Sequence, residues 1–203
     1  MTIPHHERDK PTFREASKET LLFVLQPLVR WLSVMRVRPD TLTVIGWTLA
    51  LCAAILFGLG YVRVAGLVML TGGVFDALDG AVARETNRMS SFGAFLDSTL
   101  DRLSEAAIFV GLIYFYAGAN RPYEALLAAV AMTFSLLTSY TRARAEGLNI
   151  SCEVGLLERA GRIVILSVFS IVGLPTVGLT LVAAGALVTT AQRILHVRRA
   201  TRG

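Results

Sequence analysis

Six apolar stretches, separated by short polar segments, dominate this sequence. A transmembrane helix needs about 20 predominantly apolar residues, and only the stretch that ends near residue 174 is clearly shorter than this. The pattern predicts an all-α, polytopic membrane protein with six transmembrane helices. The predicted helices lie at about residues 41–60, 64–82, 93–117, 123–144, 161–174 and 176–195.

The segment before the first predicted span is more polar and has its own helical signals. Thr12 and Glu15 are spaced as an N-cap and its capping-box partner, and residues 19–35 are apolar on one side. We interpret this part as an N-terminal interfacial amphipathic helix on the cytoplasmic membrane surface. A seventh span is the alternative, which Pro27 and Arg30 disfavour.

Basic residues indicate how the chain is oriented. Lys and Arg together number 20, and all of them except Arg63 and Arg121 fall on one side of the predicted membrane. By the positive-inside rule that side is cytoplasmic, so we expect both termini of this inner-membrane protein there. The chain thus divides into a cytoplasmic N-terminal segment, 1–38, and a six-helix membrane domain, 39–203. Because the basic residues adjoin the spans, they favour contact with anionic membrane lipids and argue against nucleic acid binding.

Four aspartates occur at helical spacing beside the apolar stretches. Asp76 and Asp79 are three residues apart, and Asp97 and Asp101 are four apart, so each pair lies on one face of its helix. Each charged side chain would cost about 2.5–3.5 kcal/mol or more at mid-bilayer. All-oxygen ligands suit Mg²⁺ or Mn²⁺, and a shared pair of such ions suits chemistry on phosphates. We therefore expect two divalent cations at these acids, at the cytoplasmic ends of the second and third spans.

Small and basic residues extend these acids into a longer motif. It reads DxxDGxxAR from Asp76 to Arg84 and, after eight further residues, GxxxDxxxD from Gly93 to Asp101. This motif resembles the signature of the CDP-alcohol phosphatidyltransferases, a family with six membrane helices. The resemblance implies an enzyme that transfers a phosphatidyl group from a CDP-diacylglycerol-type lipid to an alcohol and releases CMP. We also expect a homodimer.

The same resemblance assigns roles to individual residues. Asp101 is implied to be the catalytic base and to be shared with the metal site, whose ligands are Asp76, Asp79, Asp97 and Asp101. The segment RPDTLTVIG, at the start of the first span, is similar to one that lines the cytidine pocket in the family; a helix start with Asp40 as N-cap is the alternative. Ser90 lies near a family residue that binds the diphosphate. The implied CDP-lipid site consists of Asp40, Thr43, Asp76, Gly80, Arg84 and Ser90.

Arginines near the later spans indicate an acceptor that carries a phosphate. The segments SYTRARAEG and LLERAGRI resemble those of the phosphatidylinositol phosphate synthase branch of the family, which implies a phosphorylated polyol, inositol phosphate, as acceptor. Such a phosphate needs a cationic pocket with forked donors. Ala160 and Gly161 depart from the Pro-Glu often found there. The implied phosphate-binding residues are Arg142, Arg159, Arg162 and Arg193, although arginines at these positions can also serve only to set topology.

Other functions remain open at this point. The acceptor could be glycerol 3-phosphate or another alcohol. A membrane prenyltransferase also holds a diphosphate with aspartates, but lacks the Gly-x-x-Ala-Arg that follows Asp79 here. A cation transporter would use intramembrane acids near mid-membrane at broken helices, whereas these acids fall at predicted helix ends.

Overall fold

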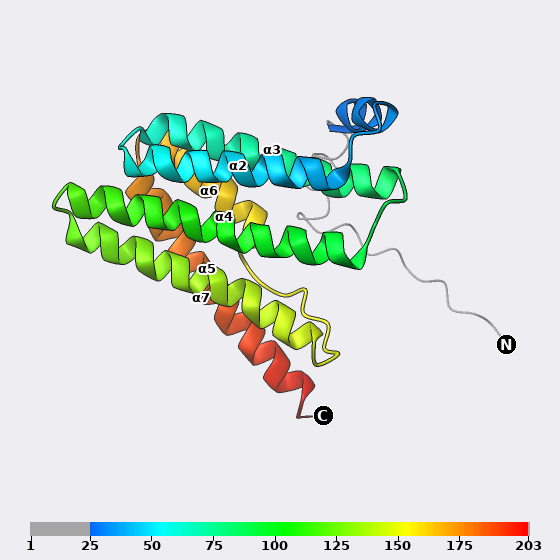
Figure 1. Ribbon diagram of the computed structural model, residues 1–203. Coiled ribbons are helices and arrows are strands. Elements are labelled where there is room, and N and C mark those ends of the chain that lie inside the picture. The colour runs from blue at the N-terminus through cyan, green and yellow to red at the C-terminus, as the bar shows by residue number, and fades with distance from the viewer. Residues whose placement is uncertain (1–24, 203) are drawn as a thin grey trace.

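The computed structural model describes residues 25–202, and the regular secondary structure in this part of the chain is helical, without strands (Figure 1). The prediction of an all-α protein is confirmed, and the helix bounds fall within a few residues of the apolar stretches. A helical segment at 25–34 comes first. It is followed by α2 (Pro39–Gly58), α3 (Val62–Glu85), α4 (Ser91–Gly118), α5 (Pro122–Glu146), α6 (Arg159–Ile171) and α7 (Pro175–Ala200).

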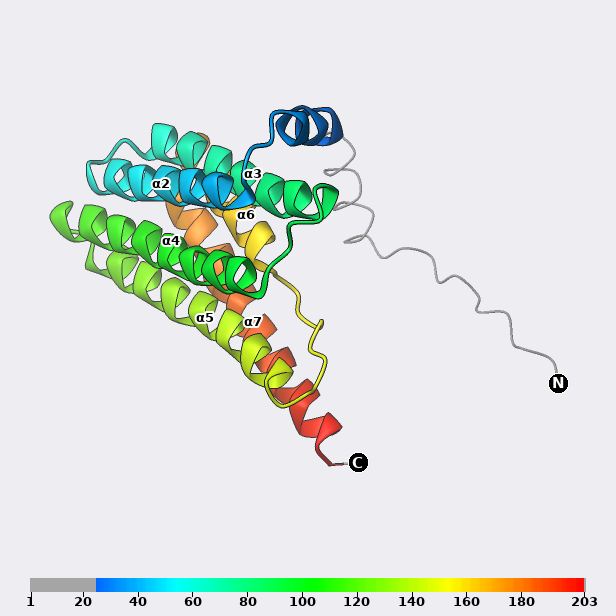
Figure 2. The ribbon, with the colours of Figure 1, turned by 45° about the vertical axis from the view of Figure 1, so that its right-hand side comes forward.

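The six helices from α2 to α7 pack as a closed ring (Figures 1 and 2). Around the ring the order is α2, α3, α6, α7, α5 and α4, and α4 returns to α2. Large side chains fill the interior, among them Phe57, Phe109, Tyr116 and Leu166. The ring places α3, α4 and α6 around one interior space, which is where the polar residues described below meet.

Four helices in the described part of the chain are long and apolar enough to cross a membrane: α2, α3, α5 and α7. The helices α4 and α6, which the sequence also predicted to span, do not meet this criterion, for separate reasons. The helix α4 has 28 residues, but four charged residues, Asp97, Asp101, Arg102 and Glu105, lie between its second and fourth turns. The helix α6 has only 13 residues, which is short of the about 20 that a span requires.

Glycine allows α2 and α4 to approach closely. A Cβ atom built on Gly111 of α4 would lie 2.1 Å from the carbonyl oxygen of Ala54 on α2, a separation that nonbonded atoms do not reach. The backbones therefore touch directly at this crossing. Because α4 carries half of the predicted acids, this contact helps to set where those acids lie.

We expect Gly111→Ala to lower the thermal unfolding temperature of the protein in detergent, because the helices must separate to accept the methyl group. Overpacking of this kind costs about 1–3 kcal/mol. Gly118→Ala is the matched control, since a Cβ atom at Gly118 meets no atom within 4 Å. An unfolding temperature equal to that of the control variant would contradict the close crossing.

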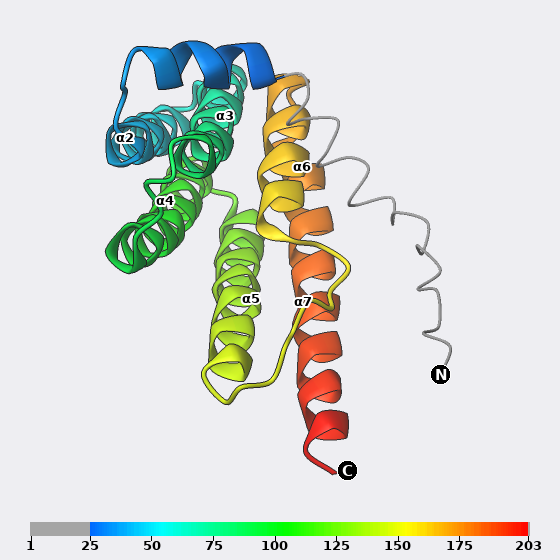
Figure 3. The same ribbon diagram turned by 90° about the vertical axis from the view of Figure 1, so that its right-hand side faces the viewer.

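The helical segment at 25–34 lies across the adjoining ends of α2 and α3 (Figure 3). Val29 is buried in a small cluster with Leu42, Leu78 and Val82, while Trp31 is 55% exposed. The segment therefore packs on the ends of α2 and α3 through one side and leaves apolar side chains such as Trp31 exposed on the other. Thr12 and Glu15, the predicted start of this helix, lie outside the described residues, and its contact with a membrane surface stays a prediction.

Candidate active site

Three of the four predicted acidic ligands converge. Asp76 lies in the second half of α3, and Asp97 and Asp101 lie in the first half of α4, which runs antiparallel to it (Figure 1). One carboxylate oxygen from each residue lies within 4.8 Å of the others, and all three side chains are half-buried. We call these three residues the acid cluster. A single cation could contact all of them, and oxygen donors of this kind fit Mg²⁺ or Mn²⁺.

Asp79 lies beside the acid cluster but has a different partner. Its side chain is buried, and the hydroxyl of Thr43 on α2 donates to its Oδ2 atom at 2.6 Å. Asp79 follows Asp76 by one helical turn, so both carboxylates face the same side of α3. The sequence grouped Thr43 with the nucleotide site, and the structure shows this hydroxyl orienting one of the predicted metal ligands.

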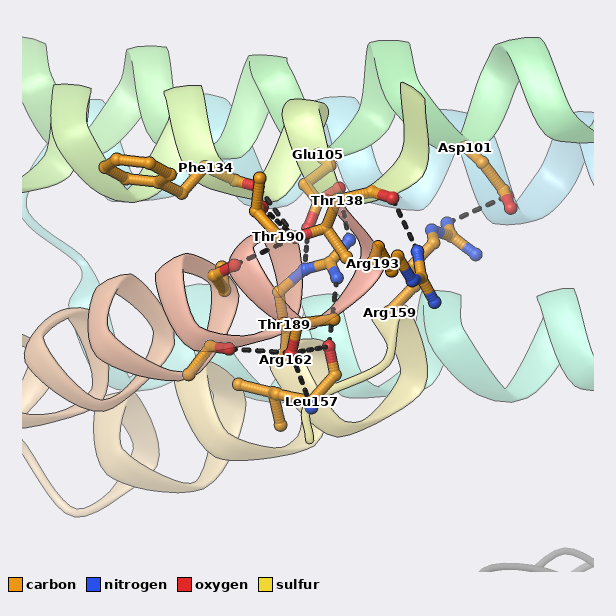
Figure 4. Close-up of polar contacts among 12 residues, drawn as sticks. Asp101, Glu105, Phe134, Thr138, Leu157, Arg159, Arg162, Thr189, Thr190 and Arg193 are labelled. Carbon is orange, nitrogen blue, oxygen red and sulfur yellow. Dashed lines mark hydrogen bonds and ion pairs between the residues drawn. The ribbon is translucent and has the colours of Figure 1, made fainter. Parts of the chain in front are cut away.

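Arg159, the first residue of α6, adds a positive charge to the acid cluster. Its guanidinium group pairs with Asp76 and with Asp101, whose Oδ1 atom lies 2.8 Å from Nη2 (Figure 4). Its Nε atom is buried and has no protein partner. The sequence assigned this arginine to an acceptor phosphate, and the structure places it directly against the predicted base.

Three of the predicted CDP-lipid residues, Asp40, Arg84 and Ser90, lie at the ends of α2, α3 and α4. A Cβ atom at Gly93 would lie 3.0 Å from Ser90 Oγ and 3.8 Å from Asp40 Oδ1, so the starts of α2 and α4 meet here. Ser90 is the N-cap of α4 and accepts a hydrogen bond from the Gly93 amide at 2.9 Å. Asp40 and Ser90 are exposed, as is Arg84, so a water-soluble nucleotide can reach them.

Asp40 is not the N-cap that the sequence suggested. The N-cap of α2 is Arg38, without a side-chain capping bond, and Pro39 follows as the first helical residue. Proline is favoured at this position because its missing N–H would have no helical partner. The helix therefore begins before Asp40, and the carboxylate lies in the first turn, where it faces Ser90 instead of capping its own helix.

The other three predicted arginines have protein partners that differ in burial. Arg162 is buried and pairs with Glu105 of α4. Arg193 is buried and donates to two backbone carbonyl groups, that of Thr138 (Figure 4) and that of Val154. The more exposed Arg142 pairs with Glu146 at 2.8 Å.

These three arginines are also close enough to interact electrostatically. Arg142 and Arg162 both lie within electrostatic range of Arg193. The region adjoins the acid cluster through Arg159, and acidic neighbours offset part of its charge, namely Glu146 at Arg142, Glu105 at Arg162 and Glu158 near Arg193. Arg162 and Arg193 would have to give up their present bonds to contact a negatively charged ligand directly.

An interior cavity continues from the acid cluster into the ring. It lies between α2, α3, α4 and α6, with Asp76 and Arg159 at its polar end and Phe109 and Leu166 among its apolar walls. Gly46 and Gly72 line it where α2 and α3 approach each other. The site is thus polar toward the helix ends and apolar toward the middle of the bundle.

Glu105 is the principal polar residue that sequence reasoning missed. It follows Asp101 by four residues, as Asp101 follows Asp97. The three acids therefore form one stripe along α4. This repeated spacing was the available signal, since it continues the motif by one more turn into an apolar stretch, where an unpaired acid would be costly.

Comparisons with known proteins agree with this arrangement. Residues 36–194 match the family model of the CDP-alcohol phosphatidyltransferases. The chain is 39% identical over 195 residues to a phosphatidylinositol phosphate synthase of Cutibacterium acnes, with 87% of this chain and 93% of the relative covered. It is 37% identical over 180 residues to an archaetidylinositol phosphate synthase of Pyrococcus horikoshii, with the same two coverages, 87% and 93%.

Solved structures of a phosphatidylinositol phosphate synthase are also similar to this chain. The Mycobacterium tuberculosis phosphatidylinositol phosphate synthase with CDP-DAG bound superposes with a TM-score of 0.77 at 31% identity, covering 84% of this chain and 92% of the other. A second crystal structure of that protein, in complex with manganese and citrate, has a TM-score of 0.76 at 32% identity, with coverages of 84% and 87%. Together with the acid cluster and the match over most of the sequence, these likenesses show that the chain is an enzyme of the CDP-alcohol phosphatidyltransferase family.

Proposed function

We propose that this enzyme transfers a phosphatidyl group from a CDP-diacylglycerol-type lipid to the hydroxyl of inositol phosphate, giving phosphatidylinositol phosphate and CMP. The observation that carries the proposal is the meeting of two charged regions. The acid cluster, which suits cations and a diphosphate, adjoins a group of arginines that suits a second, separate phosphate. Relatives named as phosphatidylinositol phosphate and archaetidylinositol phosphate synthases support the choice of acceptor.

The proposed reaction is an attack on the lipid-side phosphorus of the diphosphate. A bond forms between that phosphorus and the acceptor oxygen, and the bond to the CMP oxygen breaks. We assign Asp101 as the base that takes the acceptor proton. When bound, two divalent cations would neutralise the diphosphate and the charge that develops on CMP. Asp76, Asp79, Asp97 and Asp101 would hold them.

The two substrates would approach from different sides of the acid cluster. The nucleotide would lie against the exposed residues at the starts of α2 and α4 and the end of α3, in a site formed by Asp40, Thr43, Asp76, Gly80, Arg84 and Ser90. The acceptor phosphate would be drawn to the region of Arg142, Arg159, Arg162 and Arg193. The Nε–H group of Arg159 supports this because it has no protein partner, and a phosphate oxygen is a suitable acceptor.

We further propose that α4 and α6 complete a six-span membrane domain, 39–203, that functions as a homodimer. The closed ring supports the six-span domain, because α4 and α6 each pack between helices that are long and apolar enough to span. The basic residues support a cytoplasmic site and cytoplasmic termini. The N-terminal segment, 1–38, would lie on the same surface through its amphipathic helix.

Purified protein with CDP-diacylglycerol and Mg²⁺ should release CMP fastest with inositol phosphate in an acceptor panel that includes glycerol 3-phosphate, free inositol and serine. Arg142→Gln should raise the Michaelis constant for inositol phosphate about tenfold or more, since a charge-assisted contact contributes about 1.5–3 kcal/mol. Arg144→Gln is the matched control, because Arg144 is exposed and lies outside the assigned set. Equal use of free inositol or serine by the wild type would overturn the proposed acceptor.

A further inference from the structure

Glu105 of α4 and Arg162 of α6 form a doubly bonded ion pair inside the helix ring. The Nε and Nη2 atoms of Arg162 donate to the two carboxylate oxygens of Glu105 at 2.7 and 3.0 Å (Figure 4). The Arg162 side chain is 2% exposed and that of Glu105 is 8% exposed. Because both charges are shielded from water, removing either one leaves the other buried and uncompensated.

This pair repeats the Asp101–Arg159 pair one turn deeper in the bundle. Glu105 follows Asp101 by four residues and Arg162 follows Arg159 by three, so each helix presents both of its charged groups on one face. The two ion pairs are therefore parallel links between the same two helices.

The helices joined by these links are otherwise separated. Within residues 25–202, α4 and α6 are not among the helix pairs that pack closely. The interior cavity lies between them, with Glu105 and Arg162 in its walls. The helix α6 packs on α3 and α7, and the side chains that reach across this space are its direct links to α4, of which the deeper one is the more buried.

The bonds of Arg162 leave it little freedom to bind a substrate. Two of its nitrogen atoms are engaged by Glu105, and Nη1 lies 3.5 Å from the carbonyl oxygen of Leu157. A phosphate that contacted this guanidinium group would have to displace Glu105. That exchange would leave a second negative charge in the same buried space.

We propose that Glu105 and Arg162 are positioning residues that hold α6 in register with α4. They thereby keep Asp101 and Arg159 at the acid cluster, and Arg162 acts on the acceptor through this placement and not by contact with its phosphate. The inference rests on the proposed function only for the acceptor used in the assay. If the wild type prefers another acceptor, the proposed function fails, and the same test is run with that acceptor.

The test compares Glu105→Gln, Arg162→Gln and the double variant with the wild type, by kcat and by the Michaelis constant for inositol phosphate. Each single change should lower kcat by about 10²-fold, since a small misplacement of catalytic groups has effects of this size. The acceptor Michaelis constant should change by about the same factor in Glu105→Gln and Arg162→Gln, because each change breaks the same link that positions Arg159. The double variant should be no slower than the slower single variant, because the two residues act as one unit.

Glu124→Gln is the matched control, because Glu124 belongs to an exposed ion pair at the opposite end of the bundle; its kinetics should equal those of the wild type. If the single variants do not fold, the double variant decides, since it buries no unpaired charge. A Michaelis constant raised about tenfold or more by Arg162→Gln and by the double variant, but not by Glu105→Gln, would overturn the proposal, since it would indicate direct phosphate binding by Arg162.

Discussion

Replacing Asp97 with asparagine is expected to reduce CMP release by about 10³-fold or more, because the change removes one negative ligand from a site for divalent cations, which contribute several kcal/mol to the transition state. Asp97 is the informative member of the acid cluster. Arg159 pairs with Asp76 and Asp101, so Asp97 can be changed without breaking either ion pair. The rate of CMP release from CDP-diacylglycerol measures the effect.

The matched change outside the site is again Glu124→Gln, which should leave the rate unchanged. Chelation of divalent cations should abolish the wild-type activity, and Mg²⁺ or Mn²⁺ should restore it. A folded Asp97→Asn protein with wild-type turnover, or turnover that continues in chelator, would rule out the assigned metal site.

Asp101→Asn should lower kcat by about 10²–10⁴-fold, the usual contribution of a general base. Its effect on CDP-lipid affinity should be small if proton removal is its main task, because Asp76 and Asp97 remain to hold the cations. Single-turnover rates and CDP-lipid binding, measured separately, distinguish these contributions. Equal losses in affinity and rate would make Asp101 an ordinary ligand and leave the base unassigned.

The helices and the acid cluster could be predicted from sequence because both depend on local spacing. Apolar runs between polar segments set the positions of α2 to α7, and the intervals from Asp76 to Asp79 and from Asp97 to Asp101 place each pair of acids on one helix face. The motif then indicated that the two faces meet. The structure confirms this for Asp76, Asp97 and Asp101.

The partners of the arginines could not be predicted in this way. Arg159 and Arg162 lie far along the chain from the acids that they contact, at a sequence separation of 83 from Asp76 for Arg159 and of 57 from Glu105 for Arg162. A local pattern cannot specify such pairings, since they depend on which helices become neighbours. The sequence analysis therefore assigned all four arginines to the same acceptor-phosphate site. In the structure their burial differs, since the Arg142 side chain is exposed whereas Arg162 and Arg193 are buried.

The order of the helices around the ring has a consequence for biosynthesis. The ribosome synthesises the helices in the order α2 to α7. In the folded ring, however, α3 packs against α6, which is synthesised later, and not against α5. When the ribosome has completed α4, the acids at the ends of α3 and α4 are already present, and their counter-charge on α6 has not yet been translated. Water and free cations must balance these carboxylates until Arg159 emerges, so the site is completed by a segment that enters the bundle late.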